Sequence, residues 1–65
     1  MIGPTVVTVR VALPEDEAHA LAQFLKRAGV SDYRRLAADE AEAYAMRDGA
    51  ERLREALAAI GIAPR

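Results

Sequence analysis

The sequence predicts a small α+β fold, in which one N-terminal β-strand is followed by two or three α-helices, the last of them long and amphipathic. Apolar and polar residues alternate near the N-terminus, which is typical of a half-buried strand. Further along, apolar residues recur every three or four positions, which is typical of helices with one buried face. Sixty-five residues suffice for one small domain, so residues 1–65 are assigned to a single unit.

The strand is predicted over residues 5–13, which contain four valines and two threonines. Branching at Cβ favours a pleated surface over a helix. Pro14 ends this segment, because it lacks the N–H group that a sheet requires. We identify no second strand in the chain, so the backbone groups of residues 5–13 need a partner, and two copies of the chain could pair in antiparallel fashion.

The first helix is predicted from about residue 15 to residue 28, because acidic residues open it and an apolar stripe follows. The stripe consists of Ala18, Leu21, Ala22, Leu25 and Ala28. Gly29 is expected to adopt the left-handed conformation that ends many helices. Ser31 or Asp32 is then expected to cap the second helix.

Asp39 has capping-box spacing to Glu42, so a new helix can begin there, and a continuation of the second helix is the alternative. The last helix carries an uninterrupted heptad stripe, formed by Ala43, Met46, Ala50, Leu53, Leu57 and Ile60. Gly49 lies inside the stripe, and we interpret the segment as one helix with a weak point there, a break being the alternative. Gly61 ends the helix. The stripe suits either an internal core or a helical interface.

Several classes of protein are disfavoured by the residues that the chain lacks. Cysteine is absent, which argues against disulfide and thiolate metal sites, and no apolar run approaches the length of a membrane span. The N-terminus does not resemble a signal peptide, so a cytoplasmic location is expected. His19 is the only histidine and has no set of further ligands, and the four glycines form no phosphate-binding loop. We therefore predict a non-enzymatic protein without a metal or cofactor.

Charge is segregated along the chain although the net charge is only -1. A basic region formed by Lys26, Arg27, Arg34 and Arg35 lies between acidic regions. The second acidic region consists of Asp39, Glu40, Glu42, Asp48, Glu51 and Glu55. Acidic helical surfaces can resemble the phosphates of nucleic acid and occupy the groove that binds it. The alternative is an ordinary solvated face with ion pairs along the helix, such as Glu51 with Arg54.

The order of strand, helix, glycine-containing turn and helix over residues 8–36 resembles the ribbon-helix-helix regulators. The resemblance implies a dimer whose paired strands lie in the DNA major groove and read bases with outward side chains. It implies base contacts by Thr8 and Arg10, and a phosphate contact at Ser31 at the start of the second helix. The chain departs from that pattern at residues 39–40, which are acidic where the family buries aliphatic side chains.

Four further stretches resemble a family of small bacterial proteins of unknown function that occur in genomes and on phages and plasmids. They are Gln-Phe-Leu-Lys-Arg at 23–27, Ser-Asp-Tyr-Arg at 31–34, Glu-Ala-Tyr-Ala-Met at 42–46 and the ending Gly-Ile-Ala-Pro-Arg. The resemblance implies a mobile-element setting, in which small proteins with acidic faces are often inhibitors of host defence, including anti-CRISPR proteins.

These observations lead to two functional hypotheses. The first is a non-enzymatic protein-binding module, such as an anti-CRISPR-type inhibitor, whose acidic face covers a nucleic-acid-binding surface of a larger protein. The alternative is a dimeric ribbon-helix-helix repressor or antitoxin that binds DNA. A third possibility is a structural subunit that assembles through residues 5–13 and the heptad stripe.

Overall fold

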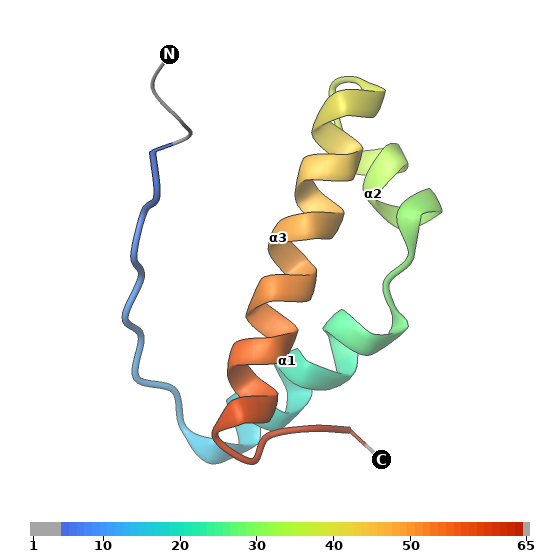
Figure 1. Cartoon of the computed structure of the whole chain (residues 1–65). Coiled ribbons are helices and arrows are strands. Elements are labelled where there is room, and N and C mark those ends of the chain that lie inside the picture. The colour runs from blue at the N-terminus through green and yellow to red at the C-terminus, as the bar shows by residue number, and fades with distance from the viewer. Residues whose placement is uncertain (1–4, 65) are drawn as a thin grey trace.

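The computed structural model describes residues 5–64, which form three α-helices and no β-strand (Figure 1). The helices are α1 (Glu15–Arg27), α2 (Val30–Leu36) and α3 (Glu40–Ala59). Helix α3 packs against both α1 and α2. Within the described residues the fold is therefore all-α, and the predicted α+β class is wrong.

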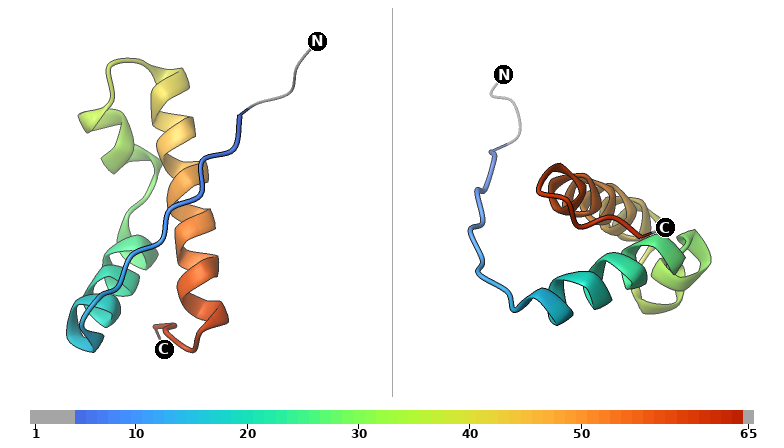
Figure 2. Two further views of the ribbon diagram at one scale, coloured as in Figure 1. Left: turned by 90° about the vertical axis from the view of Figure 1, so that its left-hand side faces the viewer. Right: turned by 90° about the horizontal axis from the view of Figure 1, so that it is seen from below.

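The correction concerns residues 5–13, which were predicted to be a strand. They run as an extended chain along α3 and lie opposite α2, with α3 between them (Figures 1 and 2). A strand requires hydrogen bonds to a neighbouring segment, and among residues 5–64 the backbone of residues 5–13 forms none to another backbone group. The alternating valines therefore predicted an extended segment correctly, but they could not supply its pairing partner.

Helix α1 begins where the sequence predicts, directly after Pro14, whose carbonyl accepts a hydrogen bond of 3.0 Å from the Ala18 amide. It ends at Arg27, and Gly29 is not left-handed, since its φ is -120° and its ψ is 177°. Gly29 instead precedes α2 as its N-cap, and its amide donates a hydrogen bond of 2.8 Å to Asp32 Oδ2. The predictions of a left-handed Gly29 and of a cap at Ser31 or Asp32 are therefore wrong.

Helix α3 confirms the predicted N-terminus and the predicted continuity. Asp39 is the N-cap, and its Oδ1 accepts a hydrogen bond of 2.8 Å from the Glu42 amide. Gly49 does not interrupt the helix. The long third helix is thus the element that the sequence predicts most completely.

Gly61 ends α3, as predicted, with a φ of 91°. The Gly61 amide donates to the Ala58 carbonyl at 3.0 Å and the Ile62 amide to the Leu57 carbonyl at 2.9 Å. These are the two hydrogen bonds of a Schellman motif. The motif turns the chain back, so that Ile62 packs against the core beside Leu57.

The core is small and lies between α1 and the C-terminal half of α3. Its buried members are Ala18, Ala22, Leu25 and Leu57, with Leu21, Ala50 and Ile62 packed against them. Ala43, in the first half of α3, is buried as well but lies outside this cluster. A compact 7.0 kDa chain exposes about 4,000 Å², whereas this chain exposes 5518 Å². Its radius of gyration is 13.3 Å, compared with about 11 Å for a compact chain of this length. The single chain therefore leaves an unusually large surface uncovered.

Replacing Gly61 with alanine is expected to lower the free energy of unfolding by about 1 kcal/mol, because a side chain disfavours a positive φ. Urea unfolding followed by circular dichroism measures the change. The matched control is Gly49→Ala, which adds a Cβ with no neighbour within 4 Å inside a helix. The control should raise the free energy of unfolding by about 0.5–1 kcal/mol. Equal effects of both variants would contradict this account of the two glycines.

Candidate interaction surface

The N-terminal segment, residues 5–13, carries four valines that are among the exposed large apolar side chains of the described residues. Val6, Val7, Val9 and Val11 are 65–84% exposed. Full burial of such a side chain is worth about 1.5–3 kcal/mol. Val7, Val9 and Val11 share one side of the extended segment, and exposed apolar side chains gathered on one side of a soluble protein indicate an interaction site.

The segment and α3 enclose an apolar groove, which we call the α3 groove. Its volume is about 210 Å³ and it is lined by Val9, Val11, Leu13, Leu53, Ala56, Leu57 and Ile60. The three lining residues from the segment occupy alternate positions. Thr8, Arg10 and Ala12 are exposed, and in an extended chain they project from the opposite side. The segment thus has an apolar side toward α3 and a more polar side away from it.

The predicted acidic region is divided into two groups. The first group, Asp39, Glu40 and Glu42, serves the beginning of α3: Asp39 caps the helix, and Glu42 Oε1 accepts a hydrogen bond of 2.8 Å from the Ala38 amide. Glu40 Oε1 lies 2.8 Å from Arg34 Nη2. These three carboxylates therefore already have local partners.

The second group consists of Asp48, Glu51 and Glu55, which share one face of α3 and line a shallow hollow together with Arg52. Arg47 Nη2 lies 2.9 Å from Asp48 Oδ1, and Arg54 Nη2 lies 3.7 Å from Glu51 Oε2. The second pair is one that the sequence predicts. Arginines interleave with these carboxylates, which reduces the net negative charge of the face.

Tyr44 is the centre of a cluster that sequence analysis did not identify. The guanidinium carbons of Arg34 and Arg47 lie 5.9 and 5.0 Å from the centroid of its ring. Arg34 Nη2 also donates a hydrogen bond of 3.2 Å to the Tyr44 hydroxyl. The Tyr44 hydroxyl, and after it Glu40, raises the pKa of Arg34 above its ordinary value. The cluster joins α2 to the first half of α3, and no sequence spacing points to it because Arg34 and Tyr44 belong to different helices.

The residues predicted to contact DNA are not gathered in the single chain. Thr8 and Arg10 lie in the N-terminal segment, whereas Ser31 is the second residue of α2. Helix α3 lies between these two elements in Figures 1 and 2. A common nucleic-acid surface built from all three residues is therefore absent from the described residues of one chain.

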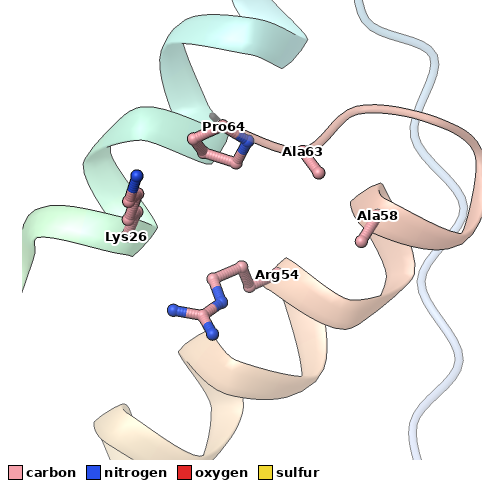
Figure 3. Close-up of a pocket in the computed structure, with 5 residues that line it drawn as sticks. All are labelled: Lys26, Arg54, Ala58, Ala63 and Pro64. Atoms are coloured by element: carbon pink, nitrogen blue, oxygen red, sulfur yellow. The ribbon is translucent and has the colours of Figure 1, made fainter.

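Two basic side chains line a second pocket, which has a volume of about 240 Å³ and lies between α1 and the C-terminal end (Figure 3). Lys26 from α1 and Arg54 from α3 line it together with Ala58, Ala63 and Pro64. The basic region predicted from the sequence contains Lys26 with residues 27, 34 and 35, and it does not contain Arg54. Arg34 and Arg35 are instead paired with carboxylates, Arg35 Nη2 lying 3.4 Å from Asp32 Oδ1. The predicted basic region is thus dispersed over separate contacts.

The described residues show neither a metal-binding cluster nor a membrane-spanning helix. Between residues 5 and 64 no group of three or more His, Asp or Glu side chains is placed to hold a metal ion. His19 Nε2 lies 3.6 Å from Glu15 Oε1 one turn away on α1. None of the three helices combines the length and the apolar character needed to cross a bilayer.

Comparison with known proteins gives a family but no activity. No curated protein and no solved structure shows a significant match to the chain. The family that matches is not described as phage, plasmid, anti-CRISPR or ribbon-helix-helix proteins, so those resemblances stay predictions. Its model covers residues 1–65, and the chain therefore belongs to the DUF7706 family, a family of unknown function.

Proposed function

We propose that the protein is a non-enzymatic binding module that acts by binding another polypeptide through the N-terminal segment and the α3 groove. The observation that carries the proposal is the alternation of apolar and polar side chains over residues 5–13. The exposed valines of this segment include Val9 and Val11, which line the groove together with apolar residues of α3. Pairing with an extended segment and docking into an apolar groove are two recurring ways in which proteins bind peptides. A cytoplasmic location stays a prediction.

The amount of uncovered surface supports this choice. The chain exposes 5518 Å², about 1,500 Å² more than a compact chain of its mass. A stable protein interface buries about 800 Å² on each partner. The excess therefore exceeds what one interface of standard size needs, and one polypeptide partner would cover about half of it.

The N-terminal segment is preferred to the acidic face for a structural reason. Asp39, Glu40 and Glu42 have capping and ion-pair partners within the chain, and removing them from those partners would weaken the start of α3. Only Asp48, Glu51 and Glu55 remain for an acidic face that could block a nucleic-acid groove, and arginines accompany them.

Site-specific photo-crosslinking in living cells tests the proposal. A benzophenone amino acid is placed at position 9 in the α3 groove, and at position 55 on the acidic face as the matched control. We expect adducts with a polypeptide from position 9 and few from position 55. Adducts from position 55 alone would overturn the proposal and favour the acidic face.

A second candidate function is DNA binding through Thr8 and Arg10. It is favoured by their exposed positions on the side of the segment away from α3. Fluorescence anisotropy with mixed double-stranded DNA should then show binding that weakens with rising salt and with Arg10→Ala. No binding at low salt would exclude this candidate.

A further inference from the structure

We propose that the polypeptide bound by the N-terminal segment is a second copy of the same chain. Residues 5–13 of the two copies would form a two-stranded antiparallel ribbon, with the twofold axis at Val9. The inference rests on the proposed function and names its partner. Each single chain keeps its three helices, and the pairing is entirely between chains.

The first argument is the state of the backbone in this segment. Between residues 5 and 64, the backbone N–H and C=O groups of residues 5–13 make no hydrogen bond to any other backbone group. The side chains on both sides are exposed apart from the contact with α3. An extended segment with free backbone groups and β-branched residues is the kind of edge that pairs with another chain.

The second argument is that the segment is complementary to itself in one register. Antiparallel pairing about Val9 places residue 5 opposite residue 13 and residue 7 opposite residue 11, so all nine residues of the segment find a partner. Odd-numbered residues then lie opposite odd-numbered ones, which keeps Val7, Val9 and Val11 on one face of the ribbon, while Val6 lies on the other face opposite Ala12. On the other face, Arg10 of one copy lies opposite Thr8 of the second copy, so each polar side chain has a polar neighbour across the ribbon.

Neighbouring registers are less favourable. An axis at Arg10 would place the two Arg10 side chains directly opposite one another, and like charges at that position are destabilising. It would also leave Thr5 and Val6 unpaired, whereas an axis at Thr8 would leave Ala12 and Leu13 unpaired. A shift by a single residue would pair Val9 with Thr8 and would place Val7, Val9 and Val11 of the two copies on opposite faces of the ribbon. Val9 is therefore the preferred centre.

The third argument is what the ribbon would cover. Its apolar face would carry Val7, Val9, Val11 and Leu13 from each copy, and in each chain this face is directed toward α3. Leu53 and Ile60 of α3 line the same groove and are exposed in the single chain. Pairing therefore places the apolar residues of both segments over the two α3 grooves. The excess surface of each chain, about 1,500 Å², is more than the roughly 800 Å² that a stable dimer interface buries on each partner.

Cysteine crosslinking tests both the dimer and its register, because the chain contains no cysteine of its own. With the axis at Val9, the two Val9→Cys side chains lie opposite one another, within the Cα separation of up to about 7 Å that a disulfide spans. The matched control is Ala12→Cys, an exposed position whose two copies would be about 20 Å apart along the ribbon. We expect mild oxidation to crosslink Val9→Cys at least tenfold faster than Ala12→Cys. Equal rates would overturn the register.

Charge substitutions at Thr8 supply a second readout by analytical ultracentrifugation. Each ribbon contains two contacts between position 8 and Arg10, so Thr8→Glu should tighten the dimer and Thr8→Lys should weaken it, each by about threefold to tenfold. Added salt should reduce both effects. Thr8 is exposed outside α1, α2 and α3, so circular dichroism should show unchanged helix content in both variants.

A wild-type chain that stays monomeric at concentrations up to 100-fold above those used for crosslinking would overturn the inference. Adducts with a different polypeptide from position 9 would then show that the proposed function stands with another partner. A dimer that persists after Val9→Lys, with no adduct from position 9, would contradict both the inference and the proposed function.

Discussion

Replacing Leu57 with alanine is expected to lower the free energy of unfolding by about 2–5 kcal/mol, which is the largest effect of any single substitution we consider. Leu57 is 6% exposed and is the α3 residue of the buried cluster formed with α1. A domain of this length has a total stability of about 3–10 kcal/mol. Urea unfolding followed by circular dichroism at 222 nm should show a midpoint at a clearly lower urea concentration than in the wild type.

Leu53→Ala is the matched control for this prediction. Leu53 lies one turn earlier on α3, in the same stripe, but it is 43% exposed and lines the α3 groove instead of the core. The variant should stay folded, with a loss of about 1 kcal/mol or less. A loss as large as that of Leu57→Ala would show that the stripe is core along its whole length.

Ala22→Leu is expected to separate α1 from α3 and to lower the free energy of unfolding by about 1–3 kcal/mol. Ala22 is 1% exposed and lies within the same buried cluster as Leu25 and Leu57. The small side chain lets the two helices approach closely, so three added carbon atoms must displace packed neighbours. Thermal unfolding measures the loss as a lower Tm.

Ala20→Leu provides the comparison on the same helix. Ala20 is exposed on α1, and leucine has almost the same helix propensity as alanine. The change should therefore alter the free energy of unfolding by less than about 0.5 kcal/mol. A similar loss in both variants would mean that the effect of Ala22→Leu arises from propensity and not from packing.

The helices could be predicted from the sequence because their signals are local. Asp39 and Glu42 are three residues apart, and the cap that they predict forms within a single helical turn. Gly61 lies where the apolar stripe ends, and the positive φ follows from the same short segment. The left-handed conformation predicted for Gly29 was wrong, because the Gly29 amide donates a hydrogen bond to Asp32 and Gly29 becomes the N-cap of the next helix.

The fold class could not be predicted in the same way, because a strand depends on a second segment. The alternation of apolar and polar residues over 5–13 predicts which side chains share one side of the extended segment. The α3 groove confirms that Val9, Val11 and Leu13 do so. The alternation carries no information about which backbone lies alongside. The structure of one chain contains no such neighbour among its described residues, so the segment is extended without being a strand.

The candidate surface was only partly predictable for a related reason. Charge counting grouped Asp39, Glu40 and Glu42 with the later carboxylates of α3, although the first group is engaged by local backbone amides and by Arg34. That engagement depends on how α2 folds back against α3, which no spacing along the chain reveals. The contact between Arg34 and Tyr44 was missed for the same reason.

Between residues 5 and 64, α1 and α2 each pack on α3 and not on one another, and this arrangement has a consequence for folding. Helices α2 and α3 are joined by three residues and can dock early, because closing a short loop costs little entropy. The contacts of α1 with Leu57 close a loop of more than thirty residues and should form later. Native-state hydrogen exchange should therefore divide the amides into two cooperative classes, with those of α1 exchanging through an opening that leaves the α2–α3 pair protected.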